Sequence, residues 1–263
     1  MTDGAFRLQG ARDEWARAIR EPQRPRRREP SQLPGEEFAV ECLRRCALYA
    51  HTGPDGLRAL VGSMGARRFR RNEVIFHQGD SGDALHIVAD GAVKIVLPSS
   101  EGEEAIIATL RRGDFFGELA LLDGAPHSAT ATAVEPTETL TLPRAAFQRL
   151  LEEDAGLRRA LLTGLTAELR RLTGQVEELH FLDLAGRLAM RLVRLARADA
   201  PASQTDIRLD WPYTQSDLAS MIGGTRQSVN RLLSGLVDDG LLRIERETLV
   251  IIDLEALARR AEQ

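Results

Sequence analysis

The chain has few cysteines, few aromatic residues and no long apolar run. Its 263 residues include two cysteines, and aromatic residues account for 5% of the total. Two thiols are too few for a four-ligand zinc or iron–sulfur site, and the five histidines are scattered along the chain. No segment approaches the roughly 20 consecutive apolar residues that cross a bilayer, so we expect no membrane span. The N-terminus also lacks the apolar centre of a secretory signal, which predicts a cytoplasmic protein.

The two cysteines, Cys42 and Cys46, are four residues apart on a predicted helix. We expect them to be small buried apolar residues in a reducing compartment rather than metal ligands. The chain also shows no nucleophile, base and orienting residue in a pattern typical of a catalytic site. The sequence therefore predicts neither a metal centre nor an enzyme.

Length and charge limit the kinds of architecture. A chain of 263 residues suits about two domains, and a composition of 43% apolar and 28% charged residues is typical of a globular protein. The net charge of −4 argues against non-specific coating of nucleic acid. It leaves room for one small basic surface, and DNA binding needs no more than that.

Residues 1–36 form a poor folding segment. The stretch from Glu21 to Pro30 combines prolines and like charges where a core would need apolar residues. We predict a disordered Arg- and Pro-rich tail. The alternative is a basic arm that touches nucleic acid.

Two helices and then a run of short strands follow the tail, within a domain predicted at residues 37–152. Apolar residues recur at helical spacing from Phe38 to Tyr49, and Pro54 begins a second helix that ends near Met64. From Glu73 to Leu142, apolar and polar residues alternate, and glycines recur at separations of 9, 11, 11 and 11 residues. Turns at this spacing predict a small all-β sandwich or barrel. The glycines are Gly82, Gly91, Gly102, Gly113 and Gly124.

A glycine-containing turn inside the β region is a candidate anion site. In the sequence Gly117-Glu118-Leu119, the glycine permits close approach of the backbone, and residues 119–122 can start a short helix whose free N–H groups face an anion. His127 and Ser128 add polar side chains at the start of the next strand. We interpret the stretch as a phosphate cradle within the barrel. The alternative is an ordinary turn between two strands.

A long amphipathic helix is predicted over residues 153–182. Its apolar residues are separated by three or four positions, and charged residues flank them. A narrow apolar stripe on so long a helix is typical of a coiled-coil seam, so we expect a second copy of the chain as partner. The alternative is a helix that lies on its own barrel, and we expect the helix to do both. The stripe consists of Leu157, Leu161, Leu165, Leu169, Leu172, Val176 and Leu179.

Residues 183–263 have the pattern of a winged helix-turn-helix. Thr214-Gln-Ser-Asp217 has the spacing of a capping box, and Gly223-Gly224 predicts the turn. The next helix has one apolar face and one polar face, and residues 241–252 are expected to form the β-hairpin wing. The alternative is a helical hairpin with a solvated face. The residues assigned to DNA contact are Thr225, Arg226, Gln227, Ser228, Asn230 and Arg231.

The order of these parts resembles the bacterial cyclic-AMP receptor protein and fumarate–nitrate regulator (Crp/Fnr) family. The resemblance implies an α+β fold: an N-terminal cyclic-nucleotide-binding-type β-roll (a jelly-roll-like barrel), a long dimerisation helix and a C-terminal winged helix-turn-helix. It also implies a homodimer that binds a twofold-symmetric DNA site, regulates transcription and contacts RNA polymerase. The resemblance runs from about Phe38 to the C-terminus. It rests on Gly79-Asp80, Arg112-Gly-Asp-Phe-Phe-Gly-Glu-Leu-Ala120, Phe181-Leu-Asp-Leu-Ala-Gly-Arg187 and Thr225-Arg-Gln-Ser-Val-Asn-Arg231.

The resemblance also implies an effector-binding set, from which this chain departs at two positions. Family members that bind cyclic nucleotides hold the cyclic phosphate with an Arg followed by a hydroxyl residue; here Ser128 matches the hydroxyl, but His127 stands where Arg is expected. A Thr–Ser pair that meets the base falls on Leu172 and Thr173, so one hydroxyl is missing. We therefore expect weak or absent cyclic-AMP binding, and either a different small anionic effector or none. The implied effector-binding residues are Gly117, Glu118, Leu119, His127, Ser128 and Thr173.

On the DNA side, the family's base-reading residues fall on Arg226, Gln227 and Arg231. Gln227 occupies a position that is often Glu in the family, which predicts a changed base preference at one position of the site. The competing hypothesis is a cyclic-nucleotide-binding signalling module whose C-terminal domain contacts protein instead of DNA. The polar face of residues 226–231 favours the DNA-binding regulator.

Overall fold

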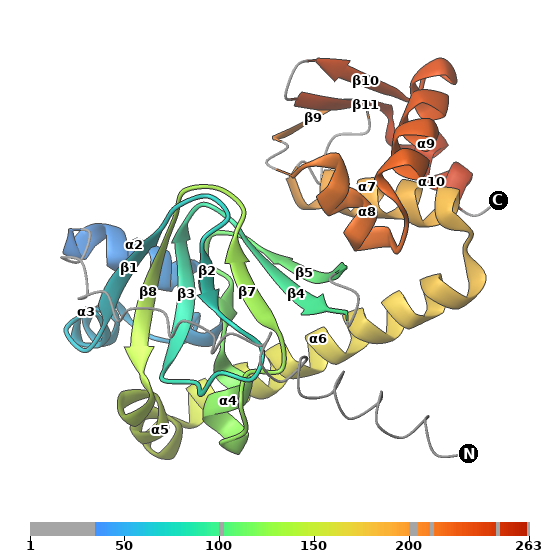
Figure 1. Ribbon diagram of the computed structural model, residues 1–263. Helices are drawn as coiled ribbons and strands as arrows, with labels where there is room; N and C mark the ends of the chain where they lie inside the picture. The colour runs from blue at the N-terminus through green and yellow to red at the C-terminus, as the bar shows by residue number, and fades with distance from the viewer. Residues whose placement is uncertain (1–34, 100–102, 200–204, 211–212, 246–247, 262–263) are drawn as a thin grey trace, which may run out of the picture. The chain divides into compact units, whose positions relative to one another are not determined.

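The computed structural model describes residues 35–99, 103–199, 205–210, 213–245 and 248–261 (Figure 1). All but the last two residues of the predicted tail lie outside this part of the chain. The described residues belong to one compact unit. They fold as an α+β protein with a β-roll, one long helix and a C-terminal winged helix-turn-helix, as predicted.

Two short helices and a 3-10 turn precede the β-roll. One continuous helix was predicted from Phe38 to Tyr49, but it is interrupted at Cys46, whose backbone is extended (φ −74°, ψ 124°). The interruption allows Cys46, Leu48 and Tyr49 all to reach the core, where each is at most 2% exposed. The prediction that both cysteines are buried is confirmed, and burial raises the pKa of the Cys42 thiol to about 11. The elements are α2 (Glu36–Arg45), η1 (Ala47–Tyr49) and α3 (Pro54–Val61).

The β-roll consists of two four-stranded antiparallel sheets. The strand order is β1-β8-β3-β6 in one sheet and β2-β7-β4-β5 in the other. Apolar side chains from both sheets, such as Val88, Val93 and Phe116, fill the space between them. The strands are β1 (Gly65–Phe69), β2 (Val74–Phe76), β3 (Ala84–Asp90), β4 (Val93–Pro98), β5 (Glu104–Leu110), β6 (Phe115–Phe116), β7 (Thr130–Ala133) and β8 (Thr137–Pro143).

Three further helices belong to this half of the chain: α4 (Glu118–Asp123), α5 (Arg144–Glu153) and the 27-residue α6 (Ala155–Phe181). Asp154 caps α6, because its carboxylate accepts hydrogen bonds from two backbone N–H groups of the first turn at 2.8 and 3.0 Å. Leu157 and Leu161 are 1% and 4% exposed and pack into the core of the same chain. The first part of the predicted seam therefore cannot contact a partner. No described helix is long and apolar enough to cross a membrane.

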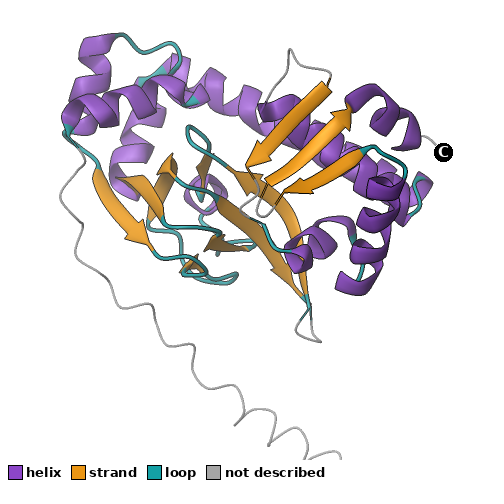
Figure 2. Cartoon of the chain, turned by 90° about the horizontal axis from the view of Figure 1, so that it is seen from above, coloured by secondary structure: helices purple, strands orange, loops and turns teal. Residues whose placement is uncertain are grey.

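The C-terminal domain packs helices around a three-stranded sheet of order β10-β11-β9, separate from the strands of the β-roll (Figure 2). The β10–β11 hairpin confirms the predicted wing. Strand β9 was not predicted, although Ile207 and Leu209 alternate with polar residues and are buried. Its pairing with β11, about forty residues away, is not visible in the sequence. The elements are α7 (Leu184–Asp199), β9 (Thr205–Asp210), α8 (Gln215–Ile222), α9 (Arg226–Asp238), β10 (Leu242–Glu245), β11 (Thr248–Asp253) and α10 (Leu254–Ala261).

Candidate DNA interface and effector pocket

Both helices of the helix-turn-helix begin at side-chain caps. At α8, Thr214 Oγ1 accepts from the Asp217 N–H at 3.1 Å, and the Asp217 carboxylate accepts from the Thr214 N–H at 2.9 Å. This is the capping box that the sequence predicted. At α9, Thr225 Oγ1 accepts from the Ser228 N–H at 3.2 Å. Each cap satisfies backbone donors that would otherwise lack a partner at the start of the helix.

The two glycines of the turn between α8 and α9 lie in different environments. Gly223 ends α8 in the left-handed conformation (φ +70°), which glycine adopts without a steric penalty. At Gly224 a Cβ atom would lie 2.9 Å from the end of the Leu184 side chain, so that side chain would have to move to admit a larger residue. The buried residues of α9 are Val229, Leu233 and Leu236, which hold its inner face against the domain core.

The outer face of α9 presents polar side chains to solvent. Arg226, Gln227, Asn230 and Arg231 are all exposed. Neither arginine forms an ion pair with any residue that the structure describes. Thr225 is also exposed, whereas Ser228 is partly buried and its hydroxyl is bonded to Thr225. The predicted contact residues therefore lie together at the N-terminal end of one rigid helix, except that Ser228 and Thr225 serve mainly as the cap.

The wing, in contrast, carries compensated charges. Arg243 lies 2.7 Å from Glu245 and 3.6 Å from Asp206, and Arg208 lies 3.2 Å from Glu245. The adjacent arginines hold the pKa of Glu245 below its usual value, chiefly through a hydrogen bond from Arg243. The tip of the predicted wing, residues 246–247, lies outside the described part of the chain. The N-terminal half of α9 thus carries two exposed guanidinium groups that have no ion pair among the described residues, whereas the described arginine of the wing, Arg243, is paired.

The predicted anion cradle begins at Gly117, which precedes α4. Gly117 has φ +85°, a conformation that favours glycine, and a Cβ there would lie 3.3 Å from the Ala84 carbonyl oxygen. The structure therefore requires glycine at this position, as the sequence suggested. The predicted short helix after it is present as α4, but it is only six residues long and its exposed side includes Leu119, which is 46% exposed.

His127 is buried and stacked rather than directed at an open anion site. It is 6% exposed, and its ring lies parallel to the Phe76 ring with centroids 3.6 Å apart and an interplanar angle of 5°. Its backbone N–H donates to the Asp80 carbonyl at 2.8 Å, and its carbonyl accepts from the Gly79 N–H at 2.9 Å. The Gly79-Asp80 turn thus fixes the position of His127. The imidazole also borders Gly117, whose Cβ position would lie 3.6 Å from its Cε1 atom.

Burial determines the protonation of this region. It lowers the pKa of His127, although Asp80 and Asp83 act in the opposite direction. It also lowers the pKa of the second buried histidine, His86, to about 3. Burial raises the pKa of Glu118 in turn. At neutral pH both imidazoles are therefore neutral, and neither supplies the positive charge that a phosphate group would need.

The other predicted effector residues are not gathered around His127. Ser128 is exposed, and its carbonyl accepts from the Gln78 side chain at 3.1 Å. Thr173 is exposed on α6, where its hydroxyl donates to the Leu169 carbonyl at 2.9 Å. The predicted assignment of these two residues to the effector stays a prediction.

The comparisons with known proteins agree with this architecture. Residues 66–154 match the cyclic nucleotide-binding domain, and residues 186–260 match the Crp-like helix-turn-helix domain. These two regions cover more than half of the chain. The chain belongs to the Crp/Fnr family of transcription regulators.

Relatives of this Crp/Fnr regulator match it over most of their length. The CRP-like cAMP-activated global transcriptional regulator of Mycobacterium tuberculosis is 30% identical over 84% of this chain and 99% of its own. The cyclic AMP receptor protein of Thermus thermophilus is 31% identical over 78% of this chain and 91% of its own. A solved CRP-family transcriptional regulator from T. thermophilus has a TM-score of 0.62 and 27% identity, and covers 75% of this chain and 97% of its own. FixK2 of Bradyrhizobium japonicum shares the fold, with a TM-score of 0.68 and 24% identity over 74% of this chain and 96% of its own.

Sequence reasoning missed the aromatic partners of His127. Phe76, His86 and Phe116 lie on three different strands, and their rings form a continuous group with His127. The only signal for them was the alternation of residues along each strand, which indicates that these side chains face one side of a sheet. Alternation does not reveal which strands face each other, so the stacking was not predictable from it.

Proposed function

We propose that this Crp/Fnr regulator works as a homodimer that reads a twofold-symmetric DNA site with α9. The observation that carries the proposal is the exposed guanidinium and amide face of that helix, which has no described ion-pair partner. Arginine recognises guanine, and glutamine recognises adenine, through paired hydrogen bonds in the major groove. Arg226, Gln227 and Arg231 lie at the end of the recognition helix that enters the groove in other helix-turn-helix proteins.

The dimer is supported by apolar residues that α6 leaves exposed. Leu162, Leu169 and Val176 are 65%, 65% and 56% exposed and follow one another at intervals of seven residues, which is the repeat of a coiled coil. Leu162 was not part of the predicted stripe, whereas Leu157 and Leu161 were and are buried. The proposed seam is therefore narrower than predicted and begins about one turn later. Such a stripe is unfavourable in water unless a partner covers it.

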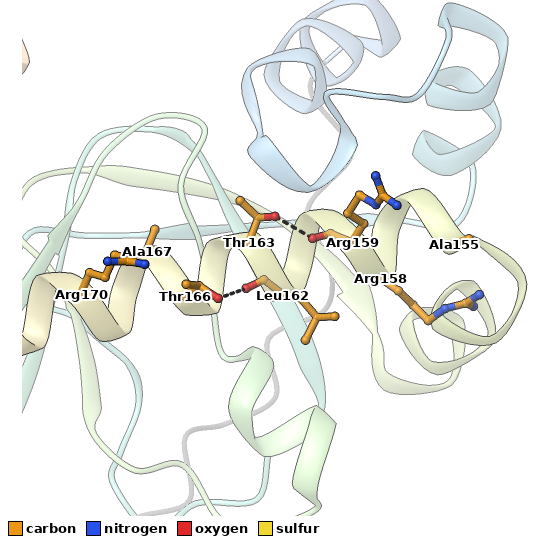
Figure 3. A pocket seen from close by; sticks show the side chains of 8 residues that line it. All are labelled: Ala155, Arg158, Arg159, Leu162, Thr163, Thr166, Ala167 and Arg170. Atoms are coloured by element: carbon orange, nitrogen blue, oxygen red, sulfur yellow. Dashed lines mark hydrogen bonds between the residues drawn. The ribbon is translucent and has the colours of Figure 1, made fainter.

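Threonines beside this seam suit a buried interface. The hydroxyls of Thr163 and Thr166 donate to the carbonyls of Arg159 and Leu162, four residues earlier on the same helix, at 3.0 and 2.8 Å (Figure 3). Both hydroxyl groups therefore already have a hydrogen-bond acceptor within α6, so burying them in a dimer interface would cost little free energy of desolvation. Thr173 is bonded in the same way.

The effector is proposed to be a small anionic molecule, with cyclic AMP binding weakly if at all. The names of the M. tuberculosis and T. thermophilus relatives connect those proteins with cyclic AMP. In this chain a neutral, stacked His127 occupies the position that resembles the phosphate-binding Arg. Gly117 and α4 still offer backbone N–H groups. The cation nearest to His127, Arg144, already donates hydrogen bonds to the carbonyls of Gly82 and Ala120, so the charge of a cyclic phosphate is less well compensated than by a free guanidinium. Contact with RNA polymerase is proposed on the resemblance to the family alone.

A binding-site selection with the full-length chain tests the DNA proposal. We expect Arg226→Ala to weaken binding to the selected site by about 1–3 kcal/mol and to relax the choice of base at one position in each half-site. Arg259→Ala is the matched control, because Arg259 is an exposed arginine of the same domain on α10. Its binding should change little.

Three outcomes distinguish the alternatives. An equal loss on every sequence, with a flatter salt dependence, would assign Arg226 to phosphate contact and remove it from base reading. Failure to select any sequence, with or without added cyclic nucleotide, would favour the signalling module that contacts protein. Equal effects of Arg226→Ala and Arg259→Ala would contradict the assignment of α9 as the reading helix.

A further inference from the structure

Three arginines of α7 converge on a small cavity between β5, α6 and the end of α8. The cavity has a volume of about 150 Å³, and its charged lining consists of Arg187, Arg191, Arg194 and Glu178. The uncharged polar groups Gln175 and Ser220 complete the polar part of the lining. The cavity is separate from both the Gly117 turn and the outer face of α9.

The hydrogen bonds of these arginines are incomplete. Arg194 pairs with Glu178, and Arg191 Nη2 donates to Thr109 Oγ1 at 3.1 Å. The Nε atoms of Arg187 and Arg191 are buried and have no hydrogen-bond partner among the described residues. A buried donor without an acceptor is unfavourable, and more so when it belongs to a charged group. The two arginines that line the cavity therefore each keep one donor without an acceptor among the described residues.

The net charge around the cavity is positive. Three arginines and one glutamate give a net charge of +2 in the lining. The C-terminal end of α8 contributes roughly half a negative charge, which leaves the cavity positive. Burial lowers the pKa of Arg191, and the neighbouring Arg194 and Arg171 act in the same direction. An acceptor that also carries negative charge is thus favoured over a neutral one.

The volume limits the size of the ligand. About 150 Å³ equals the space of about five water molecules at roughly 30 Å³ each. A tetrahedral oxyanion with one or two waters fits this space. The volume is below the roughly 300 Å³ that begins the range for pockets of drug-sized ligands, which favours a small anion over a cyclic nucleotide.

We propose that this cavity binds a small dianion of the phosphate class, with Arg187 and Arg191 as its principal donors. The planar guanidinium group presents parallel N–H donors that match two oxygens of one oxyanion. A bound anion would link α7 to β5, since Arg191 already contacts Thr109 on that strand. The proposal does not depend on DNA recognition by α9 or on the effector of the β-roll.

Calorimetry on the full-length chain with inorganic phosphate tests the site, in a phosphate-free buffer whose ionic strength is held constant with chloride. We expect saturable binding of one phosphate per chain. Arg191→Gln and Arg187→Lys should each weaken it at least tenfold; the second variant keeps the charge but removes the guanidinium fork. Arg197→Gln is the control, because Arg197 is an exposed arginine of the same helix outside the cavity, and it should bind like the wild type.

Hydrogen exchange of the wild type gives a second measurement that needs no variant. Phosphate should slow exchange in residues 104–110 and 184–199 and leave residues 226–238 unchanged. No saturable binding would overturn the proposal and would mean that ordered water alone satisfies the two Nε atoms. Equal binding by Arg187→Lys and Arg197→Gln, or unchanged exchange at phosphate saturation, would overturn it as well.

Discussion

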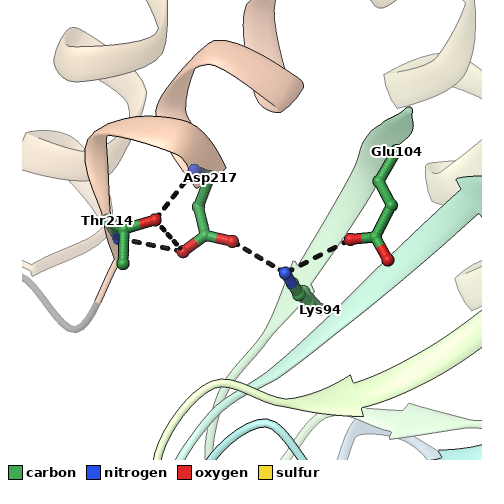
Figure 4. Close-up of polar contacts among 4 residues, drawn as sticks. All are labelled: Lys94, Glu104, Thr214 and Asp217. Atoms are coloured by element: carbon green, nitrogen blue, oxygen red, sulfur yellow. Dashed lines mark hydrogen bonds and ion pairs between the residues drawn. The ribbon is translucent and has the colours of Figure 1, made fainter. Parts of the chain in front are cut away.

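Lys94 is the only lysine in the chain, and replacing it tests how the β-roll is connected to the helix-turn-helix. Its Nζ lies 2.7 Å from Asp217 Oδ1 and 3.5 Å from Glu104 Oε2 (Figure 4). The other oxygen of Asp217 accepts from the Thr214 N–H and hydroxyl in the capping box of α8. The Asp217 carboxylate therefore caps the first turn of α8 and also forms an ion pair with Lys94 of β4.

The burial of the pair sets the expected magnitude. The side chains of Lys94 and Asp217 are 14% and 13% exposed, so the pair lies between an exposed ion pair, worth about 0–1 kcal/mol, and a fully buried one, whose rupture costs about 3–5 kcal/mol. We expect Lys94→Met to lower the free energy of unfolding by about 2 kcal/mol, because the Asp217 carboxylate then keeps its hydrogen bonds from Thr214 but loses its positively charged partner. In a double-mutant cycle with Asp217→Asn, which retains an acceptor for Thr214, the coupling energy should be about 1–3 kcal/mol.

Urea unfolding measures the cycle, and amine labelling measures the contact itself. Because the chain has a single lysine, an amine-reactive reagent modifies only Lys94 and the N-terminus. Asp217→Asn should accelerate labelling of Lys94, and Glu104→Gln should do so much less, because Glu104 is more distant and 52% exposed. Additive effects within about 0.5 kcal/mol, together with unchanged labelling in Asp217→Asn, would refute the reasoning.

The same pair has a defined pH dependence. Burial acts to raise the pKa of Asp217, but hydrogen bonds from Lys94 and Thr214 outweigh it and hold that pKa below its ordinary value. The stabilisation is therefore fully present above about pH 4, the unfolded value, and is lost as pH falls through the lower folded value. The coupling measured at pH 7 should be absent at pH values below that window.

Three further outcomes follow from the structure. Leu169→Lys with Val176→Lys should give monomers in light scattering, because the charges fall on the exposed seam; a dimer of unchanged strength would contradict that seam. His127→Arg should bind cyclic AMP at least tenfold more tightly than the wild type in calorimetry, because the substitution restores a cation. If the wild type binds cyclic AMP tightly at pH 8 and His127→Arg binds it no more tightly, His127 does not limit the affinity. The wild type should lose about 1.4 kcal/mol of unfolding free energy per pH unit between pH 6 and 4 relative to His86→Gln, because His86 takes up its proton only in the unfolded chain over that range. Parallel pH profiles of these two proteins would exclude a neutral buried His86.

Local sequence signals were sufficient for several parts of the molecule. The capping box at Thr214, the glycine turn before Thr225 and the wing hairpin involve residues close together in the chain, so each could be predicted from a short motif. The regular spacing of glycines, together with the alternation of apolar residues, predicted a small all-β sandwich or barrel, and the resemblance to the Crp/Fnr family implied the β-roll. Gly117 could be assigned to a tight turn because its conformational need is a property of the residue itself.

Contacts across long separations could not be read from such motifs. Leu157 and Leu169 have the same character in the sequence, but the first is buried in its own chain and the second is exposed, because the core reaches only the first turns of α6. Lys94 and Asp217 are 123 positions apart, and no local pattern records their contact. The lowered pKa of His127 likewise follows from its burial, which its packing against Phe76 of β2 accompanies. Most of the helices and strands were thus predictable, since they depend on local backbone geometry and periodicity, although β9 and the break at Cys46 were missed. The pairing of distant charges, rings and apolar faces arises only when the chain packs.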